Sequence, residues 1–569
     1  MPASRVLWIW LAVLVLARAL LAFVPSMWGW GVNVQRFVDP SLAWFSWALM
    51  ALALVPAFAK RGVALMEKVG DRIARSRWAY AVVGLLGVAL AWLMSDRVWF
   101  LGDFLIRMGN VEAGSLHTSF TQALPLDRWL HGSLLSFARG SAESANLALR
   151  ALGAIEAGLL AALAVAFARA LRLTGIFAAL AAGIVFFGGY LTMFTGLGKP
   201  ASELCLATVA LATFGVRAID QRSSLLPCGL VMAGALLLHR SGVLLLPAWM
   251  FAVVLARRGS KRPVDVLGIG LPLLAGIFMI PRVVAIATGY DIGHHAGSLS
   301  LRQMVDLENL VLALSPLAII TPILIVLRGR RMWERGDARL LVVLALAFLP
   351  ALSLIHPQQG IFRDWDVFAP AGVAFSVLAA FVVVETVAAT PNRTWVGVST
   401  LALVVVSSIQ WMALNHDQTR GLARVRAYLL EPPGESPRER ALTWDFLTSR
   451  NLRLGRWSEA ADAAAHAAAD APHRRIFLLW GLASTMAQDF PTAGRAYRQL
   501  LARDPKDPLG WLGLGGVAWR LNDRADLEQA VTKLKSYPRD GPEMAIIRRH
   551  LAYYPQVWPA REAVNGWSP

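Results

Sequence analysis

The stretch HPQQGIFRDWDVFAP, residues 356–370, places charged and aromatic side chains between two long apolar runs. Arg363, Asp364, Trp365 and Asp366 follow one another here. An ionisable group beside lipid is costly, so we expect these residues to serve a function. In a helical turn Arg363 and Asp366 share a face, whereas Asp364 points elsewhere. We therefore expect Arg363 to face a phosphate, with Asp366 orienting it, and Asp364 to cap the following helix.

The triplet DWD, residues 364–366, also matches the D-x-D pattern that holds a metal against a diphosphate in nucleotide-sugar transferases. Three letters alone are too weak to predict a metal site, and a monophosphate has less need of a metal. The sequence is compatible with a divalent metal but does not require one, so the cofactor is left open.

Further ionisable residues lie at the ends of other apolar runs. TGLGKPASE carries Lys199, and HRSG carries His239 and Arg240. The segment 96–146 contributes three more candidates, Asp103, Glu112 and His117. Several such groups converging from separate membrane spans would form a shared, hydrated cavity. For four other charged residues, ordinary loop polarity is the simpler interpretation: Asp96, Asp127, Arg128 and Asp291.

The composition is that of a membrane protein. The chain has 569 residues, 56% hydrophobic and 16% charged, with a mean hydropathy of +0.52. Its net charge of +18 could suggest nucleic-acid binding. However, many Lys and Arg residues lie in short loops between apolar runs, which indicates membrane topology instead. We therefore predict an all-α, polytopic helical bundle followed by a soluble tail, with no nucleic-acid partner.

Apolar runs long enough to cross the hydrocarbon core predict about thirteen spans. They lie at 5–25, 41–59, 79–95, 147–170, 174–194, 201–217, 224–238, 242–256, 264–286, 309–327, 338–355, 369–388 and 395–413. Basic loops alternate between them, so the N-terminus is expected in the cytoplasm and the tail outside. The candidate polar residues then share the outer face. The predicted domains are a membrane domain at 1–413, a stiff linker at 414–440 and a soluble domain at 441–569.

The tail contains an internal repeat of about 33–34 residues, the period of tetratricopeptide repeats. We predict repeats at 441–473, 474–507 and 508–540. Trp444, Phe477 and Trp511 open the first helix of each unit, and Gly481 allows close packing. Small and aromatic positions of the second helices include Ala460, Ala467, Ala493 and Tyr497. Stacked helix pairs form a binding surface for proteins or peptides, although a compact cap for the membrane domain is an alternative.

These features together favour chemistry on a lipid-linked substrate. A sugar donor outside the cytoplasm is normally carried on a polyprenyl phosphate. It requires an apolar groove for its tail, cations for its phosphate and a carboxylate to deprotonate the acceptor hydroxyl. Arg363, Arg240 and Lys199 are the candidate phosphate ligands. Asp103 is the candidate base, because it lies where the chain leaves a span at the start of a long outer loop. The candidate supporting residues are Asp366, Asp364, Glu112, His117, His239 and Trp365.

The acid at Asp103, the polar outer loop, the many spans and the repeat-bearing tail resemble the GT-C glycosyltransferases. The domain order is similar to that of transmembrane-and-tetratricopeptide O-mannosyltransferases and of bacterial membrane proteins with RDWD near their last spans. The resemblance implies that Asp103 corresponds to the first-outer-loop acid. It also implies a polyprenyl-phosphate donor, an inverting hexosyl transfer and a location in the bacterial inner membrane, with the repeats in the periplasm or outside the cell.

Three other functions use the same features. A transporter or flippase for a lipid-linked glycan would need the same cations and groove, but it should show inverted repeats. A polysaccharide polymerase or ligase would transfer a whole glycan. A non-catalytic assembly factor would depend on the repeats and not on Asp103. The expected acceptor is a protein or a glycan. The sequence leaves open which sugar is transferred, which acceptor is used, and whether the repeats hold the acceptor or a partner enzyme.

Overall fold

The computed structural model describes residues 2–101, 124–136, 142–257, 262–289, 300–355, 357 and 359–558. These residues form helices joined by turns, and no strand occurs among them, as the all-α prediction requires. The chain divides into two compact units, Met1–Arg424 and Val425–Pro569. The division falls within α20 (Gln418–Leu430), a helix that occupies much of the stretch expected to be a linker.

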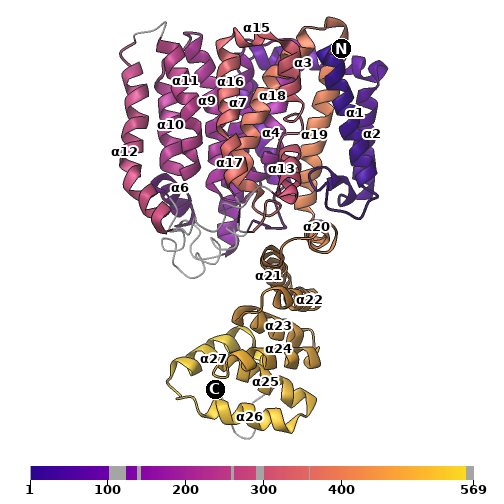
Figure 1. Cartoon of the computed structure of the whole chain (residues 1–569), viewed down its shortest axis with the longest axis vertical. Helices are drawn as coiled ribbons and strands as arrows, with labels where there is room; N and C mark the ends of the chain where they lie inside the picture. Colours follow the sequence, from indigo (N-terminus) through magenta and orange to yellow (C-terminus); the bar gives the residue numbers. More distant parts are fainter. Residues whose placement is uncertain are drawn as a thin grey trace. The chain divides into compact units, whose positions relative to one another are not determined.

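The first unit is a bundle of apolar helices (Figure 1). In chain order, the bundle begins with α1 (Ala3–Leu21), α2 (Pro40–Leu54), α3 (Pro56–Arg75), α4 (Ala79–Leu93), α6 (Pro125–Ser136), α7 (Ala142–Ala170), α8 (Gly175–Phe186) and α9 (Pro200–Ile219). The others are α10 (Leu226–Leu238), α11 (Leu246–Arg257), α12 (Asp265–Gly289), α13 (Leu301–Leu314), α14 (Thr321–Arg328), α15 (Arg330–Trp333), α16 (Gly336–Ala347), α17 (Leu349–Leu354), α18 (Ala369–Ala388) and α19 (Trp395–His416).

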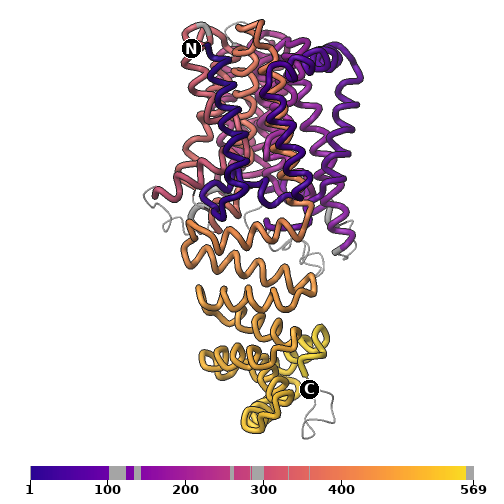
Figure 2. Tube along the Cα trace, turned by 90° about the vertical axis from the view of Figure 1, so that its right-hand side faces the viewer, coloured from indigo at the N-terminus to yellow at the C-terminus, as the bar shows by residue number. Residues whose placement is uncertain are grey.

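Six of the described helices are long and apolar enough to cross a membrane, or seven if the bent pair α2–α3 is one span. Five shorter apolar helices accompany them. Each of the thirteen predicted spans falls on one of these helices or on a broken pair. The described helices long enough to cross a membrane are fewer than the thirteen predicted spans because several apolar runs are interrupted. For example, the run 309–327 is divided between α13 and α14, and α3 turns away from α2 by 92° to cross one end of the bundle (Figure 2).

Helix α18 lies at the centre of the bundle. In its most apolar 18-residue stretch, 89% of the residues are buried. The helix packs against α8, α9, α14 and α16. Its sequence, APAGVAFSVLAAFVVVETVA, is apolar on every side, which is the pattern of a fully enclosed helix. The RDWD stretch leads directly into α18 through a short 3₁₀ turn, Trp365–Phe368. The most buried helix of the bundle therefore fixes the position of these polar residues.

The second unit consists of stacked helical hairpins. The pairs are α21 (Pro437–Arg453) with α22 (Trp457–Asp470), α23 (Arg474–Met486) with α24 (Phe490–Arg503), and α25 (Pro508–Leu521) with α26 (Arg524–Lys535). Helix α27 (Pro542–Tyr553) follows. Figure 2 shows the hairpins in orange to yellow. Each predicted repeat contains one hairpin. Gly481 packs against Tyr497, and an added Cβ would lie 2.5 Å from its ring.

Candidate functional site

A buried ion pair joins two of the predicted site residues. Lys199 Nζ lies 2.6 Å from Asp366 Oδ2, and the side chains are 9% and 5% exposed. The two residues are 167 positions apart in the chain. In a buried pair of this kind, each charge compensates the other for the loss of contact with water. The structure thus brings together a candidate phosphate ligand and a candidate supporting carboxylate.

Local backbone features place both partners. Lys199 immediately precedes α9, after a turn in which Gly196 and Gly198 have φ values of +108° and +58°. At Gly198 a Cβ would also lie 2.5 Å from the Leu149 side chain, so this turn requires glycine. On the other side of the pair, Trp365 packs on Trp411 of α19, with ring centroids 4.9 Å apart. This contact holds the 3₁₀ turn that carries Asp366.

Arg363 is buried, at 8% exposure, and its guanidinium lies 5.7 Å from the ring centroid of Phe100. Phe362 contacts the same ring, with centroids 5.5 Å apart, and also packs edge-on against Trp30. Arg424 lies over Phe362 at 5.0 Å. Two buried guanidinium groups therefore flank one aromatic cluster, an arrangement that stabilises cations away from water.

Arg424 was not predicted as a site residue, because it lies in the stretch interpreted as a linker. Its guanidinium donates to the Trp30 carbonyl at 2.7 Å. The sequence signal that could have revealed it is weak, since Arg424 belongs to a short amphipathic helix, GLARVRAYLL, that also contains Arg426.

Asp364 does not cap the following helix, in contrast to the prediction. The helix α18 begins after Phe368 and has no side-chain cap, whereas Asp364 Oδ2 accepts a hydrogen bond from the Gln359 amide at 3.4 Å. The intervening 3₁₀ turn separates Asp364 from the first turn of α18. Burial and the neighbouring Asp366 raise the pKa of Asp364 to about 6, although Lys199 and Arg363 oppose the shift. Asp366 forms an ion pair with Lys199, a partner that the sequence did not indicate.

The remaining predicted residues lie elsewhere or outside the described parts. Arg240 is exposed at the start of a 3₁₀ turn, Arg240–Leu245, unlike the buried Lys199 and Arg363. His239 Nδ1 accepts a hydrogen bond from the Ser241 amide at 3.2 Å and so caps the 3₁₀ turn Arg240–Leu245. Asp103, Glu112 and His117 lie outside the described residues.

A second buried polar cluster adjoins the first. His131 of α6 is completely buried, with Nδ1 2.7 Å from Asp127 Oδ1 and Nε2 3.3 Å from Glu203 Oε1 of α9. Glu156 of α7 lies beside Glu203 and Ser202. The expectation that Asp127 is an ordinary loop residue is therefore wrong: it is 4% exposed. Asp96, also expected in a loop, is buried and accepts from the Trp99 amide at 2.8 Å. The spacing Asp-x-x-x-His on a helix was the available signal.

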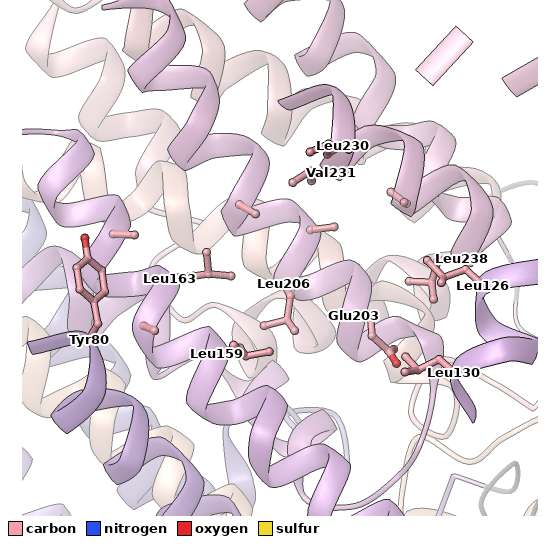
Figure 3. Close-up of a pocket in the computed structure, with 16 residues that line it drawn as sticks. Tyr80, Leu126, Leu130, Leu159, Leu163, Glu203, Leu206, Leu230, Val231 and Leu238 are labelled. Carbon is pink, nitrogen blue, oxygen red and sulfur yellow. The ribbon is translucent and has the colours of Figure 1, made fainter. Parts of the chain in front are cut away.

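An apolar groove of about 490 Å³ ends at this second cluster. Figure 3 shows Glu203 and Leu130 at one end and Tyr80 at the other, with leucines between them. Its walls come mainly from α7, α9 and α10 and include Leu159, Leu163, Leu206, Val231 and Leu238. Glu203 is the one charged residue among the groove's lining residues in the described part of the chain. Lys199 immediately precedes α9 and Glu203 lies in its first turn, so the groove ends at the helix terminus that Lys199 precedes.

The two clusters can hold charge in different ways. The first provides cations that can bind an oxyanion, and the second provides carboxylates around an imidazole that can hold a proton. Among the described residues, no group of three or more His, Cys, Asp or Glu side chains is arranged to hold a metal ion.

No family model and no curated protein matches the chain. Among solved structures, it is similar to the oligosaccharyltransferase of Archaeoglobus fulgidus, crystallised with zinc and sulfate. The TM-score is 0.32 at 14% sequence identity, and the match covers 67% of this chain. The chain spans 57% of the length of that protein.

Proposed function

We propose that this chain is a GT-C-like membrane glycosyltransferase that moves a sugar from a polyprenyl-phosphate donor to an acceptor hydroxyl. The observation that carries the proposal is the buried Lys199–Asp366 pair, with Arg363 three residues before Asp366 and an apolar groove that ends at Glu203, four residues after Lys199. A lipid phosphate needs this combination, because its head is an anion and its tail is a hydrocarbon.

The phosphate would bind to Lys199 and Arg363. An ammonium group has three N–H donors, so Lys199 can bind a phosphate oxygen while it remains paired with Asp366. A guanidinium binds an oxyanion through two parallel hydrogen bonds, which would orient the phosphate at Arg363. Asp364 adjusts the charge of the site. Its raised pKa, about 6, means that it loses one negative charge in mildly acidic conditions, which favours an anionic ligand.

The donor's tail would lie in the groove that ends at Glu203. The groove lies among helices that are long and apolar enough for a membrane, and its lining is almost entirely hydrocarbon. The tail moves from lipid hydrocarbon into the groove and not out of water, so its burial adds little free energy. The groove would therefore set where the tail lies, and the cations would determine where the reacting phosphate lies.

In the reaction, the acceptor hydroxyl attacks the anomeric carbon of the sugar while its proton passes to the carboxylate of Asp103. The bond from this carbon to the phosphate oxygen breaks, and the departing phosphate carries the negative charge. Lys199 and Arg363 stabilise that charge as it develops. A single displacement inverts the configuration at the anomeric carbon. We place the reaction on the outer face of a bacterial inner membrane and assign the hairpins of the second unit as tetratricopeptide repeats that bind the acceptor or a partner enzyme.

A transfer assay tests this proposal. The purified chain in lipid is incubated with radiolabelled polyprenyl-phosphate sugars and a periplasmic extract, and labelled product is separated from donor. We expect transfer by the unmodified chain and by Glu334→Gln, a control at an exposed carboxylate directly after α15, and none by Asp103→Asn. Undiminished transfer by Asp103→Asn would remove Asp103 from its role as base.

The same preparation separates the alternatives. A flippase would move the labelled donor between the leaflets of a vesicle without forming product. An assembly factor would keep its cellular function in Asp103→Asn but lose it when the hairpins are damaged. Absence of transfer with every donor, together with either of these results, would contradict the transferase proposal.

A further inference from the structure

The last helix of the second unit does not continue the stack of hairpins. Within the stack, each second helix packs on the first helix of the next hairpin, as α24 does on α25. Helix α27 packs instead on α25, and the 3₁₀ turn Pro555–Val557 packs on α23 and α25. Those two are the first helices of adjacent hairpins, and they contact each other. The chain therefore turns back and covers the surface that α23 and α25 share.

Two glycines of α25 allow the chain to approach this closely. A Cβ at Gly516 would lie 2.0 Å from the Val557 carbonyl oxygen, and a Cβ at Gly515 would lie 2.9 Å from the indole of Trp558. Real Cβ atoms do not approach other atoms so closely, so both positions require glycine while the segment is in place. Val557 is 1% exposed and Trp558 8% exposed. The aliphatic and aromatic side chains are thus enclosed, as anchors of a bound peptide would be.

Arg520 holds the backbone of the same segment. Its guanidinium donates to the carbonyls of Gln556 and Val557, the latter at 3.5 Å, and to Gly516 of its own helix at 2.7 Å. These bonds go to main-chain atoms, so they do not depend on the side chains of the bound segment. Main-chain hydrogen bonds combined with side-chain pockets are a general means of peptide recognition.

We propose that the surface formed by α23, α25 and Arg520 is a peptide-binding site that the chain's own segment Gln556–Trp558 occupies. The partner is a protein that presents a short segment in which an aliphatic residue is followed by tryptophan, and it displaces the internal segment when it binds. This inference rests on the proposed binding role of the second unit and specifies the chemistry of its ligand. It does not depend on sugar transfer.

Peptide binding in trans tests the proposal. A chain ending at Tyr554 is prepared in lipid nanodiscs beside the full-length chain, and a fluorescein-labelled peptide, YYPQVW (553–558), is titrated into each. Fluorescence anisotropy reports binding, and circular dichroism of both chains reports whether the helices are retained. We expect the shortened chain to bind the peptide at least about tenfold more tightly than the full-length chain does, because the internal segment competes.

Three changes locate the site. In the shortened chain, Arg520→Gln should weaken binding about tenfold, because it removes the two bonds to the peptide carbonyls. Gly516→Leu should abolish binding, and a peptide carrying Trp558→Ala should not bind. Arg524→Gln, a matched loss of charge at an exposed position of α26, should have no effect.

Two results would overturn the proposal. One is a shortened chain that keeps its helices but does not bind the peptide. The other is a shortened chain whose second unit unfolds, because the segment would then be part of the permanent core. Sugar transfer, measured in the same nanodiscs, is a separate result: a loss of transfer with intact peptide binding would count against the proposed enzyme and not against this site.

Discussion

The two buried polar clusters of the first unit differ in the balance of their charges. The Lys199 cluster contains two cations, Lys199 and Arg363, for two carboxylates, Asp364 and Asp366. The second cluster groups three carboxylates around a single imidazole, His131. Both clusters involve the start of α9: Lys199 immediately precedes this helix, and Glu203 lies in its first turn.

This difference indicates separate tasks. A balanced cluster can accept an added anion, because its cations are already held in place and one of its acids protonates readily. A cluster with excess acid repels an anion and must share protons among its members. The lipid phosphate is therefore expected at Lys199, while Glu203 and His131 limit how far the anionic head can move into the groove.

Removing Lys199 should have the largest effect. In Lys199→Met, Asp366 loses the ion partner that compensates its buried charge, so the free energy of unfolding should fall by about 3–5 kcal/mol. The double variant Lys199→Met/Asp366→Leu should recover much of this loss in thermal unfolding, but neither variant should bind donor. Lys60→Met removes an exposed lysine and serves as the matched control. A single variant as stable as the control would show that the pair contributes little.

The next largest effect concerns Asp364 and depends on pH. Its folded pKa of about 6 lies above its usual value of 3.8, so its contribution to stability is fully present below about pH 4 and is lost as the pH rises through 6. Asp364→Asn cannot ionise, and its amide oxygen can still accept from Gln359. We expect this variant to match the unmodified chain at pH 4 and to exceed it by about 3 kcal/mol at pH 8. Melting curves across this range measure the difference, and a constant offset would contradict the assignment.

A smaller change of stability is expected in the acidic cluster. Glu156→Gln replaces one of two adjacent buried carboxylates with an amide that can donate to Glu203. The amide donates to Glu203 without requiring a shared proton, so the protein should be more stable by about 1 kcal/mol at neutral pH. Donor affinity should be unchanged, because Glu156 is not among the proposed phosphate ligands. A large loss of donor binding in this variant would mean that the two clusters act as one site.

Narrowing the groove should have the mildest effect. Ala207 of α9 lines the groove, and Ala207→Trp would fill part of it. We expect KM to rise a few-fold for a long-chain donor and to remain the same for a donor with a single isoprene unit. Ala57→Trp, at an exposed position of α3, is the control. Equal effects on both donors would argue that the tail binds elsewhere.

Periodicity predicted the elements of this protein better than the contacts of its site. The apolar runs and the 33–34-residue repeat indicated where helices would form, because these patterns are local. The Lys199–Asp366 pair joins residues 167 positions apart, and only the packing of α9 and α18 brings them together. Ionisable residues near membrane boundaries could be identified as candidates, but their partners could not.

The misassigned residues have a common cause. Asp127 lies on α6, a short helix on which it contacts the buried His131, whereas a loop in water would present Asp127 to solvent. Asp364 was expected to cap α18, but an intervening 3₁₀ turn moves it away from the start of that helix. In each case the residue types were informative, and their direction depended on tertiary contacts.

Photo-crosslinking of a lipid donor tests the central claim most directly. A polyprenyl phosphate with a photoreactive group in its tail is bound to the chain in nanodiscs, irradiated and mapped by mass spectrometry. The account predicts labelling of groove residues such as Leu159, Leu163 and Leu206, with loss of the label in Arg363→Gln and on competition with unlabelled polyprenyl phosphate. Labelling of other helices, or groove labelling that is unaffected by Arg363→Gln and by the competitor, would contradict it.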